Sequence, residues 1–86
     1  MVAGLTLSPG LPGELVVSWE PASLADNYAV TRQVLGVDVQ PVFVKRVSDT
    51  ETTLRGLPAG ATVKVTIVSH NGTGDSLPVE AAAIVG

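Results

Sequence analysis

Apolar and polar residues alternate most regularly between Ala61 and Asn71. Val63, Val65 and Ile67 occupy every second position, and threonine or lysine fills the positions between them. Successive side chains of a β-strand point to opposite faces, so this spacing places three branched apolar side chains in a core and the polar ones in solvent. The pattern predicts a half-buried central strand.

A period of two also marks other segments, and glycine, proline, asparagine and serine gather between them. The terminal segment contains Glu80 and three alanines, which favour a helix by local propensity. An isolated helix of two turns is marginal in water, so we predict an edge strand there. The further predicted strands cover residues 5–7, 14–20, 28–34, 41–47, 53–55 and 78–85.

Two segments stay open at this level. In the strand 41–47, either Phe43 or its neighbours Val42 and Val44 face inward, and the pattern does not choose between them. In the loop 36–41, neither Val37 nor Val39 has a predicted place. The polar residues 48–52 are interpreted as a turn.

Seven short strands without a helical period predict an all-β, seven-stranded antiparallel β-sandwich, formed as one domain by residues 1–86. Aromatic rings lie in the core more often than on a binding platform, so Trp19 is assigned to the core. The predicted core consists of Leu15, Val17, Trp19, Tyr28, Val30, Leu54, Leu57, Val63, Val65 and Ile67.

Composition excludes several functions. The chain has no cysteine, so neither a disulfide framework nor a thiolate metal site supports the fold. Five dispersed basic residues against eight acidic ones give a net charge of -3, which argues against nucleic-acid binding. No apolar run is long enough to span a membrane, and the first residues do not resemble a signal peptide.

Five segments of the chain follow a known pattern in their order and spacing. They are Leu15-Val-Val-Ser-Trp19-Glu-Pro21, Tyr28-Ala-Val30, Leu54-Arg-Gly56-Leu57, Val63-Lys-Val65 and Ser69-His-Asn71-Gly-Thr-Gly74-Asp-Ser76-Leu-Pro78. By these segments the chain resembles the fibronectin type III family over essentially its whole length. The resemblance implies seven strands in two sheets, with strands A, B and E packed on C, C′, F and G, and with residues 61–71 as strand F. Val63 departs from the family, which usually has a tyrosine there.

The loop before the last strand is the candidate interaction site. Adhesive members of the family carry Arg-Gly-Asp there, but this chain has Thr73-Gly74-Asp75, so integrin binding is not carried over. A glycine-rich loop first of all closes a hairpin, and we favour that interpretation. The candidate residues are His70, Asn71, Thr73, Asp75 and Ser76.

No constellation of residues indicates chemistry. His70 is the only histidine, and Asp26, Asp38, Asp49 and Asp75 fall in different loops, so no metal site is expected. No nucleophile elbow is present, and we expect no catalytic residue and no cofactor. Asn71-Gly-Thr73 fits the glycan acceptor pattern, although Asn-Gly is already explained as a turn.

These observations predict a non-catalytic module of a larger extracellular or cell-surface protein, acting as a spacer or a protein-interaction surface. The alternative is an accessory domain of a secreted carbohydrate-active enzyme. Neighbouring domains of the same chain, or another protein, are the expected partners, and the isolated domain is expected to be a monomer. An engineered binding scaffold would carry more tyrosine and tryptophan in its loops. The predicted outward face presents Thr31, Gln33, Thr62, Lys64 and Thr66.

Overall fold

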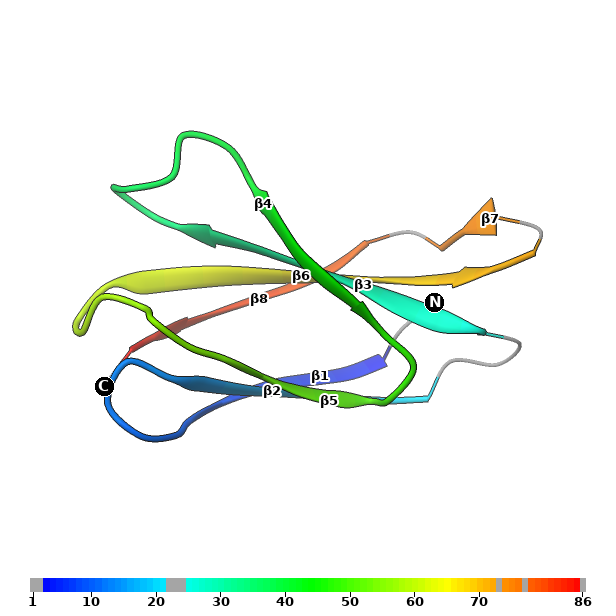
Figure 1. The fold of residues 1–86 in the computed structure, drawn as a ribbon, viewed down its shortest axis with the longest axis horizontal. Helices are drawn as coiled ribbons and strands as arrows, with labels where there is room; N and C mark the ends of the chain where they lie inside the picture. The colour runs from blue at the N-terminus through cyan, green and yellow to red at the C-terminus, as the bar shows by residue number, and fades with distance from the viewer. Residues whose placement is uncertain (1–2, 22–24, 73, 77, 86) are drawn as a thin grey trace.

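Figure 1 shows the computed structural model, which describes residues 3–21, 25–72, 74–76 and 78–85. These residues form strands and turns, and none of them belongs to a helix that could cross a membrane. The strands are β1 (Ala3–Pro9), β2 (Leu15–Glu20), β3 (Asn27–Val34), β4 (Val42–Val47), β5 (Glu51–Leu54), β6 (Thr62–Asn71), β7 (Gly74–Asp75) and β8 (Val79–Ile84).

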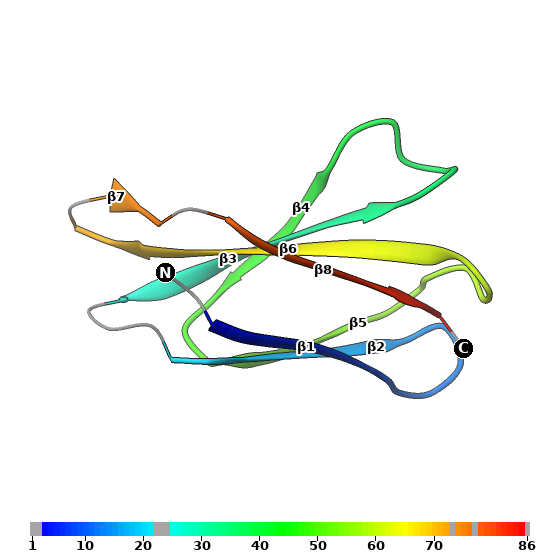
Figure 2. The same ribbon diagram turned by 180° about the vertical axis from the view of Figure 1, so that it is seen from behind.

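Two antiparallel sheets pack face to face. The smaller sheet has the order β1-β2-β5, and the larger has the order β4-β3-β6, with β7 and β8 both paired to β6. In Figure 2, β8 and β1 lie beside each other along one edge of the sandwich. The all-β antiparallel sandwich is thus confirmed. The strand count rises from seven to eight because the two-residue β7 pairs with the end of β6.

Alternation along the strands builds the core between the sheets. Val63, Val65 and Ile67 of β6 are fully buried, and their neighbours on either side are only half-buried. All ten residues assigned to the core from the sequence are buried in the structure. Val34, at the end of β3, and Val85, just after β8, join them.

The turn between β1 and β2 is held against the turn between β5 and β6. The Leu57 amide donates a hydrogen bond of 3.0 Å to the Gly13 carbonyl. Gly13 has a φ of 81°, and a Cβ built there would lie 3.2 Å from the Leu57 carbonyl oxygen. Glycine therefore serves both the backbone conformation and the close approach at this position.

The fifth strand begins earlier than predicted. The sequence placed its start at Thr53 and interpreted 48–52 as a turn, but β5 begins at Glu51 and Thr52 is buried. The reason is the pairing with β2, which sets Thr52 opposite the fully buried Val17. Pairing with β2 thus extends the strand into a polar segment whose composition indicates a turn.

The first strand is also longer than the predicted 5–7. It covers Ala3–Pro9, because β2 pairs with it from Glu20 opposite Ala3 to Leu15 opposite Pro9. An irregularity between Ala3 and Thr6 coincides with Gly4, whose φ is 66°. Pairing with β2 therefore overrides the turn signal that Ser8 and Pro9 give in the sequence.

Neither alternative for the segment 41–47 is correct, because β4 turns no face fully into the core. Every residue from Val42 to Arg46 is exposed, and only Val47 is half-buried. The strand lies at the edge of the larger sheet, hydrogen-bonded to β3. Figure 1 shows the start of β4 and the loop before it projecting away from the three-stranded sheet, which leaves this part of the strand without a facing layer.

Candidate interaction surfaces

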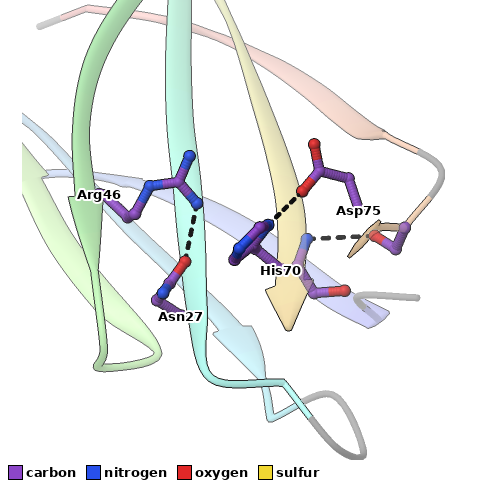
Figure 3. Close-up of polar contacts among 6 residues, drawn as sticks. Asn27, Arg46, His70 and Asp75 are labelled. Carbon is purple, nitrogen blue, oxygen red and sulfur yellow. Dashed lines mark hydrogen bonds and ion pairs between the residues drawn. The ribbon is translucent and has the colours of Figure 1, made fainter. Parts of the chain in front are cut away.

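The predicted interaction loop is a hairpin with defined internal contacts. The end of β6 pairs with β7, which sets His70 opposite Asp75 and Asn71 opposite Gly74. His70 Nδ1 lies 2.5 Å from Asp75 Oδ1, as the close-up in Figure 3 shows. Both side chains are partly exposed, so this contact holds the hairpin together at its surface.

Ser76 fixes the base of the same hairpin. Its hydroxyl accepts a hydrogen bond of 3.1 Å from the Ser69 amide, and its own amide donates one of 2.8 Å to the Ser69 carbonyl. These bonds satisfy the backbone N–H and C=O groups of Ser69, which is buried, so the role of Ser76 is structural. Thr73 lies outside the described residues.

A second polar contact lies on the same side of the larger sheet. Arg46 of β4 donates a hydrogen bond of 2.8 Å from Nη1 to Asn27 Oδ1 on β3, and Asn27 is paired with His70. Four polar side chains therefore follow one another across the sheet: those of Arg46, Asn27, His70 and Asp75. Among the described residues, no group of three or more acidic or histidine side chains is placed to hold a metal ion.

The outward face of the larger sheet is polar at its centre. Thr31, Gln33, Thr62, Lys64 and Thr66 are all half-buried, because the alternate residues on β3 and β6 fill the core. Lys64 Nζ lies 3.7 Å from Glu80 Oε2 on β8. An exposed pair at this distance adds little stability, so the face resembles an ordinary solvated surface.

The buried rings give no platform for stacking a sugar. Trp19 and Tyr28 are 5% and 4% exposed, and their ring centroids lie 5.4 Å apart in an edge-to-face arrangement. Phe43 is the aromatic side chain that reaches solvent, at 58% exposure. Among the described residues, the structure therefore gives no aromatic surface on which a sugar ring could stack.

Sequence analysis missed the surface that stands out most in the structure. We call it the hairpin surface, and it lies on β4 and on the loop between β3 and β4. The signal was present, because apolar residues occupy both odd and even positions from 34 to 44, which no half-buried strand requires. Its members, all exposed, are Leu35, Val37, Val39, Val42, Phe43 and Val44.

The loop that carries part of this surface is ordered by its own hydrogen bonds. Asp38 accepts a bond of 2.9 Å from the Val34 amide at Oδ2, and its amide donates one of 2.8 Å to the Val34 carbonyl. The Leu35 amide donates to the Thr62 carbonyl at 2.9 Å. These bonds fix the backbone on both sides of the exposed Val37.

The contact between His70 and Asp75 is expected to contribute less than about 1 kcal/mol to stability, because both side chains are partly exposed and water screens the contact. A double-mutant cycle with His70→Ala and Asp75→Ala, measured by urea unfolding, gives this coupling energy. The matched control is the cycle on the exposed pair of Lys64 and Glu80, which should give a similarly small value. A His70–Asp75 coupling above about 2 kcal/mol would show that the hairpin tip is a main stabilising element.

The fold matches solved structures along nearly its whole length. The fn3 domain of human collagen alpha-1(XX) chain has a TM-score of 0.88 and 24% identity, covering 99% of this chain and 83% of that one. An Fn3-like protein from Clostridium thermocellum has a TM-score of 0.83 and 17% identity, covering 99% and 91%. The twitchin kinase region from C. elegans (Fn31-NL-kin-CRD-Ig26) has a TM-score of 0.80 and 23% identity, covering 96% of this chain and 16% of that one.

No protein-family model matches the chain, and no curated protein sequence matches it. At identities of 24% or less, the three structural similarities concern the fold.

Proposed function

Because the chain has the fibronectin type III fold, we propose that it is a non-catalytic module of a larger extracellular or cell-surface protein, where it serves as a spacer and as a surface for protein contact. Its partners are neighbouring domains of the same chain and another protein. The isolated domain is a monomer.

The placement of the two chain ends carries the spacer function. Ala3 at the start of β1 is paired with the end of β2, and Ile84 at the end of β8 is paired with the start of β6. Because the strands of a sandwich run along its length, the start of β1 and the end of β8 lie at opposite ends of the molecule, as Figure 1 shows. The long dimension is 38 Å, against 24 and 17 Å for the others.

The core makes this separation rigid. Twelve apolar residues drawn from both sheets and the adjoining turns form one buried cluster. Interiors packed in this way transmit force with little deformation. A module of this kind sets the distance between whatever precedes and follows it without any chemistry of its own.

The spacer function predicts one narrow distance between the two ends of the domain. The chain has no cysteine, so spin labels attach only where cysteines are introduced, as in Asp49→Cys combined with Ala59→Cys. Both positions are exposed, and they lie in turns at opposite ends of the sandwich. Pulsed electron paramagnetic resonance should give a single narrow distance. A broad or divided distribution would contradict the spacer function.

The location at the cell surface is tested separately. On intact cells that make the parent protein, a membrane-impermeant biotin reagent should label it. Labelling that appears only after the cells are lysed would contradict an extracellular site and would leave the spacer function intact.

A further inference from the structure

Exposed apolar side chains concentrate on one hairpin. Eight large hydrophobic residues are exposed in the described part of the chain, and six of them belong to the hairpin surface. Val39 is 94% exposed, Val37 69% and Phe43 58%. A contiguous apolar patch on a monomeric domain marks an interaction site more often than single scattered residues do. The core does not explain these residues, because the smaller sheet does not face them.

Edge pairing does not explain them either. An exposed edge strand is open to another strand, and proteins block this with proline, bulges and charged side chains. β4 carries all three: Pro41 precedes it, the pairing with β3 slips at Val44, and Lys45 and Arg46 follow. These features disfavour a continuous hydrogen-bonded addition along β4. What remains available to a partner is the side chains of the hairpin surface.

The charge of the hairpin is opposite to that of the rest of the domain. Residues 28–47 hold three basic residues, Arg32, Lys45 and Arg46, against one acidic residue, Asp38. The remainder of the chain holds two basic and seven acidic residues. The Asp38 carboxylate accepts a bond from the Val34 amide within the loop, which reduces its effect on a partner. The hairpin is thus an apolar, positively charged element on an acidic domain.

Lys45 and Arg46 directly follow the apolar residues of β4. Phe43 and Arg46 share the outward face, because they pair with Thr31 and Ala29 of β3. The Arg46 guanidinium is exposed, and its contact to Asn27 uses one of its five N–H donors. A ligand that lies along β4 would therefore meet apolar side chains first and cationic ones next.

We propose that the hairpin surface docks an acidic segment of another protein along the outward face of β4, where the apolar side chains of the segment cover Phe43 and its carboxylates meet Arg46. This inference rests on the proposed function and names the chemistry of the partner. Complementary charge steers association and fixes orientation, and the apolar contacts supply the burial.

Two other occupants fit the charges less well. A second copy of the chain would bring Lys45 and Arg46 of two β4 strands close together, which is repulsive. An anionic membrane attracts clusters of four or more basic residues, and it would also meet the acidic remainder of the domain. A short acidic segment meets the hairpin alone.

The proposal is tested by titrating the 15N-labelled chain with a synthetic peptide in which glutamate alternates with leucine. Amide shifts should change at residues 35–47 and at their β3 partners. The affinity should fall several-fold when the ionic strength rises from about 0.05 to about 0.5 M, because exposed charges are screened. The matched control is the same peptide with lysine in place of glutamate, which should leave the spectrum unchanged.

Variants of the chain separate the two parts of the surface. Arg46→Glu, on the same face of β4 as Phe43, should weaken binding by about tenfold through charge reversal. Phe43→Ser should weaken it by a similar factor through lost apolar contact. Lys64→Glu, on the outward face away from β4, is the control and should bind like the parent chain. All these side chains are at least partly exposed, so their replacement should leave the fold intact. Amide shifts that stay unchanged away from the substituted residue, in the absence of peptide, verify this for each variant.

Several results would overturn the proposal. These are no shifts with the acidic peptide, shifts confined to other strands, or equal binding of the lysine peptide. Shifts that depend on protein concentration without peptide would assign the surface to a second copy. Binding to vesicles of phosphatidylserine and phosphatidylcholine, without binding of the peptide, would assign it to a membrane. The spin-label distance is independent of all these results, so the spacer function can stand when the docking proposal fails.

Discussion

Replacing Ile67 by alanine is expected to lower the free energy of unfolding by about 3 to 4 kcal/mol, because the side chain is fully buried in the central strand and its removal leaves a cavity. β6 is hydrogen-bonded to β3 on one side and to β8 on the other. Ile67 pairs with Val30 of β3 and with Val79 of β8. Strands on both sides hold the backbone in place and limit collapse around the cavity.

This loss is a large share of the 5 to 15 kcal/mol that stabilises a typical domain. Urea unfolding followed by circular dichroism measures it, and the dependence on urea concentration should keep its slope. Thr66→Ala is the control, since Thr66 is adjacent on the same strand but faces outward, and its cost should stay below about 1 kcal/mol. Equal losses for the two variants would mean that β6 does not separate a core face from a solvent face.

Replacing Trp19 by alanine is expected to cost about 3 to 5 kcal/mol, the range for large aromatic side chains in cores. Trp19 lies on β2 and is 5% exposed, and it packs edge-to-face on Tyr28 from the opposite sheet. The variant loses both the buried ring and the aromatic contact between the sheets.

Trp19→Phe separates the ring from its polar group. The indole Nε1 is buried and has no hydrogen-bond partner among the described residues. An unsatisfied buried donor costs about 1 to 3 kcal/mol, so phenylalanine should recover much of what its smaller volume loses. The expected cost is less than half that of Trp19→Ala, measured by urea unfolding followed by circular dichroism. Equal costs for the two variants would contradict this expectation, because phenylalanine keeps a large ring in the core and alanine does not.

The buried surface follows from local order in the sequence. Val63, Val65 and Ile67 could be assigned to the core because a strand alternates its side chains whatever it pairs with. The same reasoning assigned Leu15, Val17 and Trp19 to the inner side of β2, where the structure buries them. The fold could be predicted from these patterns together with the resemblance to a known family.

The contacts at the candidate sites depend on how strands pair and pack, which the local sequence pattern does not specify. The hairpin of His70 and Asp75 could be named from its turn residues, but their contact follows from the pairing of β6 with β7. The hairpin surface could not be predicted, because alternation of apolar and polar residues identifies only strands that have one buried face, and β4 has none. Thr52 became buried only because Val17 lies opposite it.

The sequence by itself determined which side chains of β2, β3 and β6 face the core, because alternation is a property of one strand and its own residues. Only the tertiary structure decided that β4 stays exposed on both sides and that Phe43 and Arg46 share its outward face. The physical reason is that exposure depends on which sheet stands opposite a strand, and the two sheets of this sandwich differ in width.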